Sequence, residues 1–390
     1  MQPRHSRRRS TWNLEPVKAL PAEVPITMAN NFLRALVTAL RPGHDDRAID
    51  DSTARSVAFD GALDDIDVAG LAAVGRGPIG DIAVDPERDT VVVTNTGAQS
   101  LTVINPHTMG VVGSVRLAGD PFAVVVADDR AYVSVATPGH DAIVAVDTIT
   151  GAVLNEYPLA FSVTALTVSP DGKRVFAGRA GNERIDIAVI DTTAERVGTI
   201  DIATGAGVNL DALQIDSTGK RLYVATSDYR GSRLVVVNTE TAQAQATVWI
   251  GAPIRDIAIG DGVAYVLTSD LAHRGVVHTV DLSAGTVVDA VEIGGAPTQL
   301  VLSTDATRAY VVDYDRVIVW CTLTSEIQGS IDVHEQPAAV ALQDNGTRLY
   351  IADYAGQVNV FDVAESLYSQ LVSTDAVEMH QLPALAPAGV

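Results

Sequence analysis

Short apolar runs separated by tight turns recur along most of the chain. In one representative stretch the expected strands are Leu213–Ile215, Arg221–Thr226, Arg233–Val237 and Gln245–Ile250. These segments are short and rich in β-branched residues, and turn residues bound each of them, which is typical of β-strands. The third is an almost uninterrupted apolar run, which indicates a strand buried on both faces. The stretch therefore predicts one four-stranded antiparallel unit.

This unit occurs seven times, at intervals of about 40–44 residues. Proline often opens the first strand, and an Asp or Asn usually follows the third, where its side chain is expected to cap the next turn. The clearest copies of the first hairpin turn are Ser169–Phe176, Asp216–Val224, Ser303–Val311 and Gln343–Ile351. A period of this length with several strands per repeat predicts an all-β, seven-bladed β-propeller. The predicted blades begin near residues 77, 119, 161, 207, 251, 294 and 335.

These repeats resemble those of the YVTN-type β-propeller family over roughly residues 77–363. The shared pattern runs from a proline through Asp-Gly-x-Arg-apolar-Tyr-Val to a third strand ending in Ile-Asp-Thr. The chain departs from it at Asp128-Asp129, a shorter turn, and at Trp320-Cys321-Thr322. The resemblance implies the propeller fold. It does not specify an activity, because related proteins include exported and surface-associated proteins, and sugar-lactone hydrolases share the fold.

The seventh copy stops at Phe361-Asp362 with only three clear strands. An open sheet edge would promote aggregation, so a strand from the N-terminal side is expected to close the ring. Two segments are candidates, Ser56–Phe59 and Asp65–Val68. We favour the second, because Ile66-Asp67-Val68 repeats the sequence Ile331-Asp332-Val333 from the end of the sixth copy.

The remaining sequence divides into a non-repeating arm over residues 1–50, the propeller over 51–365 and a tail over 366–390. The arm contains one segment of helical apolar spacing, over 26–41. Arg7–Arg9 is followed by charges and prolines rather than an apolar core, so no cleaved export signal is expected. No stretch has the length of a transmembrane helix. The cytoplasm is the default location, with export or surface association as the alternative.

The formal net charge is −21, and the chain is 47% hydrophobic. The first fifty residues hold eight basic and five acidic side chains, so residues 51–390 carry −24. Such a body repels nucleic acid and anionic lipid surfaces. Cys321 is the only cysteine, which excludes an internal disulfide. We expect a monomer that binds a protein partner, and predict no cofactor.

Loops between the second and third strands of the repeats are rich in Arg, Asp and Tyr. In a propeller these loops share one end of the ring with the loops that enter each blade. Exposed Tyr and Arg favour recognition of a protein or an anionic ligand, although Asp and Arg can also simply neutralise one another. The predicted binding-face residues are Arg179, Arg184, Asp228, Tyr229, Arg230, Arg233, Arg274, Asp313, Tyr314, Asp315, Arg316, Asp353 and Tyr354.

No recognised catalytic or metal-binding motif is present. A Gly-x-Ser-x-Gly elbow, a phosphate-binding loop and a zinc spacing of the eight His are all missing from the sequence. We therefore predict no catalytic residue and no metal site, and favour a non-enzymatic binding or scaffold protein with a protein or envelope partner. The alternative is a lactone or ester hydrolase, possibly dependent on a divalent cation, for which only the resemblance in fold argues. Its candidate ligands near the right strand ends are Asp81, Asn95, Asn209, Asp211 and Asp256.

Overall fold

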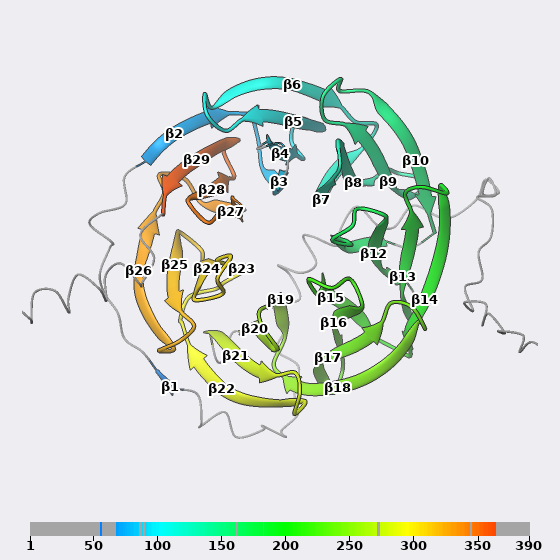
Figure 1. Ribbon diagram of the computed structural model, residues 1–390, viewed down its shortest axis with the longest axis vertical. Coiled ribbons are helices and arrows are strands. Elements are labelled where there is room, and N and C mark those ends of the chain that lie inside the picture. Colours follow the sequence, from blue (N-terminus) through cyan, green and yellow to red (C-terminus); the bar gives the residue numbers. More distant parts are fainter. Residues whose placement is uncertain are drawn as a thin grey trace, which may run out of the picture.

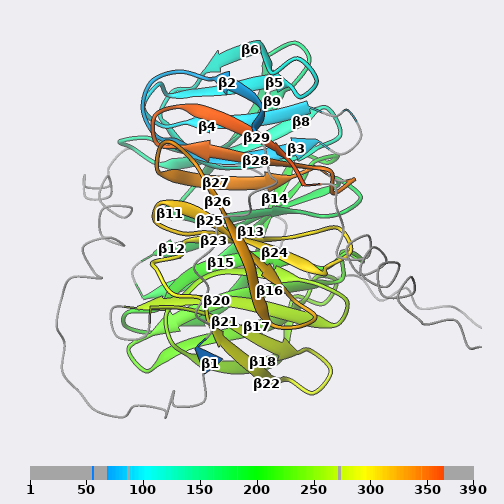
Figure 2. The same ribbon diagram turned by 90° about the vertical axis from the view of Figure 1, so that its left-hand side faces the viewer.

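Seven β-sheets surround a common axis (Figure 1). The computed structural model describes residues 55–56 and 68–363, apart from residues 86, 87, 89, 161, 182, 271–273 and 344. Each blade contains four antiparallel strands, and the first strand of each blade lies nearest the axis. Seen from the side, neighbouring sheets pack face to face around the ring (Figure 2). The predicted all-β, seven-bladed propeller is confirmed.

The strands of the first four blades follow the order of the chain. Blade 1 contains β3 (Ile79–Asp85), β4 (Thr90–Asn95), β5 (Ser100–Asn105) and β6 (Gly110–Arg116); blade 2 contains β7 (Asp120–Ala127), β8 (Arg130–Ala136), β9 (Asp141–Asp147) and β10 (Val153–Leu159); blade 3 contains β11 (Ser162–Val168), β12 (Arg174–Gly181), β13 (Arg184–Asp191) and β14 (Arg196–Thr204); blade 4 contains β15 (Asn209–Ile215), β16 (Arg221–Asp228), β17 (Gly231–Asn238) and β18 (Gln243–Gly251).

Two of the last three blades, blades 5 and 7, include a strand from the N-terminal side of the chain. Blade 5 contains β19 (Ile254–Ile259), β20 (Val263–Asp270), β21 (Arg274–Asp281) and β22 (Thr286–Glu292), with β1 (Arg55–Ser56) at its outer edge; blade 6 contains β23 (Gln299–Leu302), β24 (Arg308–Val312), β25 (Arg316–Cys321) and β26 (Glu326–Asp332); blade 7 contains β27 (Pro337–Leu342), β28 (Arg348–Asp353), β29 (Gln357–Asp362) and β2 (Val68–Ala73). The helix expected over 26–41 and the tail over 366–390 lie outside the described residues.

Strand β2 closes the ring by pairing antiparallel with β29, so that an N-terminal strand completes blade 7, as predicted. The predicted position was wrong. Residues 57–67 lie outside the described part of the chain; of the favoured segment Val68 begins β2, and of the other Ser56 belongs to β1, which pairs in parallel with β22 of blade 5. The sequence of β2 does not show the apolar alternation of a strand, because Ala72 is the only fully buried residue in it. Gly70 packs closely against blade 1, because a Cβ at this position would lie 2.7 Å from Cγ of Met109. The sequence pattern does not reveal this contact.

Asp and Asn after the third strands stabilise the turns to the fourth strands. Oδ1 of Asp147, for example, accepts hydrogen bonds from the backbone N–H groups of Ile149 and Thr150, at 2.9 and 2.7 Å. The same pair of bonds recurs in four other blades, at Asn105, Asp191, Asn238 and Asp281. The expected capping role is therefore confirmed in blades 1 to 5.

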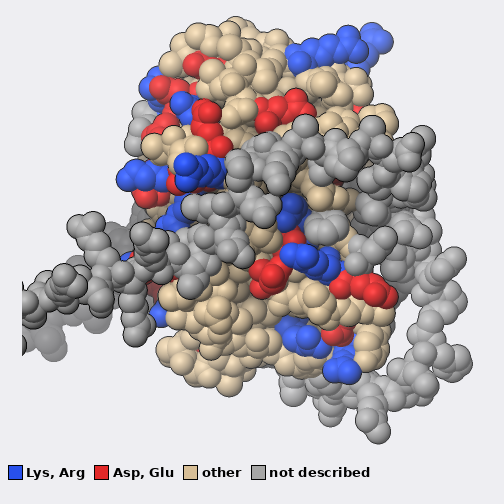
Figure 3. Space-filling view, turned by 90° about the vertical axis from the view of Figure 1, so that its right-hand side faces the viewer, with Lys and Arg blue, Asp and Glu red and all other residues tan. Residues whose placement is uncertain are grey.

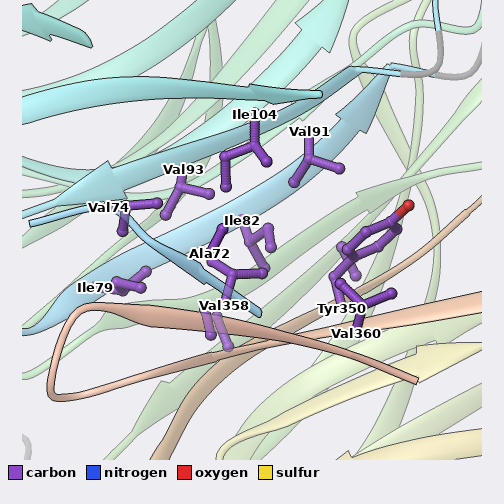
Figure 4. Close-up of a cluster of buried hydrophobic side chains, with 13 residues drawn as sticks. Ala72, Val74, Ile79, Ile82, Val91, Val93, Ile104, Tyr350, Val358 and Val360 are labelled. Atoms are coloured by element: carbon purple, nitrogen blue, oxygen red, sulfur yellow. The ribbon is translucent and has the colours of Figure 1, made fainter. Parts of the chain in front are cut away.

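The hydrophobic core is divided among the interfaces between neighbouring blades. Within the described residues, seven buried clusters form, one for each pair of adjacent blades. Figure 4 shows the cluster that joins blade 7 to blade 1, where Ala72 of β2 lies beside Ile82 and Val358. Because β2 contributes to this interface as well as to the sheet of blade 7, ring closure is a packing event and not only a hydrogen-bonding one. Trp320 and Cys321 are also buried, in blade 6.

Candidate functional site: the entry face

One end of the ring, here named the entry face, carries the turns between second and third strands and the starts of the first strands. Thus the turn Tyr229–Arg230 of blade 4 and the turn Tyr314–Asp315 of blade 6 lie at the same end of the ring. These turns are short and connect long buried strands. The entry face is therefore a set of loops held on a rigid scaffold, which is the usual setting for recognition residues.

Three tyrosines of the predicted set are exposed on this face. The exposed fraction is 78% for Tyr229, 67% for Tyr314 and 40% for Tyr354. Tyr354 is the least exposed of the three, and its partial burial raises the pKa of its phenol. Asp315 and Arg274 are exposed as well, and Arg274 adopts a φ of 56° at the start of β21. Large exposed aromatic side chains on one face are the residues that most often contribute the energy of a protein interface.

Blade 4 brings four predicted residues into direct contact. Oδ1 of Asp228 accepts the backbone N–H of Arg230 at 2.7 Å, and Oδ2 accepts a guanidinium nitrogen of Arg233 at 2.8 Å. The Arg230 guanidinium lies 5.2 Å from the centroid of the Tyr229 ring, and its Nε donates to the phenol oxygen at 2.9 Å. Partial desolvation opposes ionisation of Asp228, but these hydrogen bonds and the two guanidinium charges outweigh it and lower its pKa.

The same corner includes Trp249, which the sequence analysis did not identify. Arg233 lies 5.4 Å from the centroid of the Trp249 indole, and the ring is 41% exposed. A bulge between Ser232 and Arg233 makes Trp249, rather than its neighbour, the partner of Arg233 on β18. A Trp in a strand without charges was the only sequence signal, and its orientation depends on that bulge.

Blade 3 places its two predicted residues in an ion-pair network. Arg179 is only 8% exposed, and its Nε donates to Oδ1 of the fully buried Asp186 at 2.7 Å. Arg184 lies 3.3 Å from the other oxygen of Asp186 and also pairs with Asp201. Arg179 is therefore part of the blade's interior rather than of an exposed surface.

Two predicted aspartates serve the backbone. Asp313 is 3% exposed and accepts the N–H of Ala296 at 2.7 Å, while Arg316 lies 3.8 Å away. Asp353 is 1% exposed and accepts the N–H groups of Ala355 and Gln357, at 3.0 and 2.8 Å. Both side chains shape the loops that present Tyr314 and Tyr354, so their contribution to recognition would be indirect.

The aspartates near the axis join one blade to the next. Oδ1 of Asp256 accepts the N–H of Ile257 in its own strand, and Oδ2 accepts the N–H of Leu300 in blade 6. Asp81 makes the same two bonds, to Ile82 and to Val124 of blade 2. In blade 6 an amide takes this role, because Oε1 of Gln299 accepts the N–H of Val340 in blade 7. The sequence signal was a polar residue two or three positions after a strand-opening proline.

Asp81 and Asp256 are also two of the five candidate ligands of the hydrolase alternative. Asn95 is buried and accepts the N–H of Ala98 at 2.7 Å, whereas Asn209 is exposed at the start of β15. Among the described residues, no three His, Cys, Asp or Glu side chains gather closely enough to hold a metal ion. Asp81 and Asp256 instead act as acceptors between blades.

Burial raises the pKa of Asp256 to about 7 and the pKa of Asp81 to about 6. Hydrogen bonds from the backbone oppose the rise in both groups. The negative charge of Asp81 raises the pKa of Asp256 further. Burial likewise raises the pKa of Asp211 to about 6, against the hydrogen bond from Ser227 and the Arg255 charge.

These shifts predict that the propeller loses stability as the pH rises. At a pH between the unfolded and folded pKa values of such a group, the folded state binds more protons than the unfolded state. The stabilisation is therefore complete below the unfolded pKa and is lost as the pH rises through the folded pKa. From about pH 5 to about pH 8, Asp256 alone should lower the free energy of unfolding by about 2.5 kcal/mol. Urea titrations over this range should show a flatter pH dependence for Asp256→Asn. Asp261→Asn, in an exposed turn, is the control, and equal slopes for both variants would contradict the assignment.

Charges of both signs are interspersed on the side of the ring that carries β10 and β14 (Figure 3). No large area of a single sign is visible among the coloured residues of that side. Over the residues that the structure describes, no helix has the length and apolar character needed to span a membrane.

Comparison with known proteins identifies close relatives. A seven-bladed beta-propeller protein of Mycolicibacterium smegmatis is 68% identical over 354 residues, which cover 90% of this chain and 96% of that protein. A seven-bladed beta-propeller protein of Mycobacterium tuberculosis is 33% identical over 333 residues, covering 76% of this chain and 84% of the relative. Among solved structures, hydrazine synthase of Kuenenia stuttgartiensis matches with a TM-score of 0.67 at 18% identity, over 76% of this chain and 98% of the other, which shows a shared fold alone. No family model matches the chain.

Proposed function

Because the chain belongs to the seven-bladed β-propeller protein family, we propose that it is a non-enzymatic binding platform whose entry face docks a protein partner. The observation that carries the proposal is the exposure of Tyr229, Tyr314 and Tyr354 at one end of the ring. Tyr supplies a large contact area at low entropic cost, and Arg provides directional hydrogen bonds beside it. We also infer that the repeats are of the YVTN type, on the evidence of the Asp-Gly-x-Arg turn at Asp171–Arg174 and its variants in other repeats.

The mechanism is the display of preformed side chains. The loops of the entry face are fixed by their own hydrogen bonds, such as those that Asp228 and Asp353 accept from nearby backbone N–H groups. A partner that meets such a surface need not order it first, which reduces the entropic cost of association. The charge of −24 over residues 51–390 would disfavour strongly acidic macromolecules everywhere except at local Arg clusters.

Affinity capture tests this function. The wild type would be immobilised and exposed to cell extract and to culture medium of the source organism, beside a variant carrying Tyr229→Ala, Arg230→Ala and Tyr314→Ala. A matched control carries Ile149→Ala, Arg196→Ala and Leu323→Ala, which are exposed residues at the opposite end of the ring. We expect a protein that the wild type and control retain and the entry-face variant loses by about tenfold or more. Retention by all three, or loss in the control, would contradict the proposal.

A further inference from the structure

The corner of blade 4 differs chemically from the rest of the entry face. This corner, defined by Asp228, Tyr229, Arg230, Arg233 and Trp249, combines two guanidinium groups with two exposed aromatic rings. It contains one carboxylate, and strand β18 contributes no charged residue over its whole length. The corner therefore has a local excess of positive charge on a strongly acidic body.

The Arg side chains of blade 3 are more fully neutralised than those of the blade-4 corner. Two guanidinium groups in blade 3, at Arg179 and Arg184, are met by the carboxylates of Asp186 and Asp201. In the blade-4 corner both oxygens of the single carboxylate already accept hydrogen bonds from within the corner. The exposed edge of the Arg230 guanidinium thus points to recognition of an acceptor supplied by another molecule.

The corner is also held rigid before any partner arrives. Gly231 has a φ of 133°, and a Cβ at this position would lie 2.8 Å from the carbonyl oxygen of Gly251 and 2.9 Å from the Trp249 ring. The turn and the indole are therefore packed directly against each other. Cation–π contacts with Tyr229 and Trp249, at 5.2 and 5.4 Å, further hold the two guanidinium groups in place. A preformed arrangement of this kind binds with little loss of side-chain entropy.

We propose that the blade-4 corner binds an acidic peptide segment of a partner protein. A carboxylate of the segment accepts hydrogen bonds from Arg230, and an adjacent apolar side chain packs on the exposed rings of Tyr229 and Trp249. Nucleic acid fits less well, since its continuous phosphate charge would meet the acidic body on every side of this small corner. The inference rests on the proposed binding function and specifies the chemistry of the partner.

Selection from a random library of displayed peptides of about 12 residues tests the inference with the full chain. The library is selected on the wild type after depletion on a variant carrying Tyr229→Ala and Arg230→Ala. We expect the enriched peptides to place Asp or Glu beside an aromatic or aliphatic residue. The best peptide, synthesised with a fluorophore, should bind about tenfold more weakly to Arg230→Ala and to Tyr229→Ala. Arg230→Lys should restore only part of the loss, and added salt should weaken binding.

Arg196→Ala, which removes an exposed guanidinium from the opposite end of the ring, is the control and should bind like the wild type. Enrichment of basic or uncharged peptides, absence of enrichment, or an equal loss in Arg196→Ala would overturn the inference. The test uses only purified chain and synthetic peptides, so its failure is distinct from failure of the proposed function. Capture of a native protein through the entry face, together with no preference for acidic peptides, would support the proposed binding function and reject only the acidic-peptide chemistry.

Discussion

Replacing Ala72 with Asp is expected to lower the free energy of unfolding by about 4 kcal/mol, which is a large fraction of the stability of an ordinary domain. Ala72 is 3% exposed in β2 and packs in the cluster between blade 7 and blade 1. The substitution would place an uncompensated carboxylate in that cluster and weaken the strand that closes the ring. Urea unfolding monitored by far-ultraviolet circular dichroism measures the effect.

Ala73→Asp is the matched control for this prediction. Ala73 is the next residue of β2, and its side chain is exposed. The same new charge at this position should change the free energy of unfolding by less than about 0.5 kcal/mol. Similar losses at both positions would show that β2 does not pack as described, and that closure depends on another segment.

Removal of the Asp186 carboxylate should be the second most damaging change. Asp186 is fully buried and faces the Arg179 and Arg184 guanidinium groups, so Asp186→Ala removes the charge that compensates the buried Arg179. Loss of one member of a buried pair costs about 3–5 kcal/mol. Thermal and urea unfolding of the variant should show this loss without a change of fold.

Asp201→Ala separates burial from pairing in this network. Asp201 also pairs with Arg184, but its side chain is 77% exposed. An exposed pair contributes only about 0–1 kcal/mol, so this variant should be close to the wild type. The double variant Arg179→Met/Asp186→Leu should regain much of the stability lost in Asp186→Ala, because no buried charge remains in that pair. Equal losses for Asp186→Ala and Asp201→Ala would contradict the assignment of the network to the interior.

The repeat made the architecture predictable, because seven similar copies each contain the strands of one blade. The capping positions, such as Asp147, followed from the same regularity. The closing strand was misplaced because β2 is outside the repeat and only Ala72 is fully buried, so its hydrophobic alternation is weak. Propeller closure could be expected from the incomplete seventh copy, but the residues that perform it could not.

The face residues were predicted by loop position, which does not determine the direction of a side chain. Tyr229 and Asp313 occupy similar turns, yet the tyrosine is 78% exposed and the aspartate is 3% exposed. The difference arises because Asp313 accepts a backbone hydrogen bond from Ala296, whereas the Tyr229 phenol accepts one from the exposed Arg230. Trp249 was missed because its contact with Arg233 depends on a bulge that the strand pattern does not reveal.

Site-specific photocrosslinking tests the central claim most directly, since it asks which face meets a partner in the cell. A photoreactive benzophenone amino acid would replace Tyr229 in one chain and Ile149, exposed at the opposite end of the ring, in another. After irradiation of cells of the source organism, the binding-platform account predicts a discrete adduct with another protein from position 229 and none from position 149. An adduct from position 149 alone, or no adduct from position 229, would contradict it.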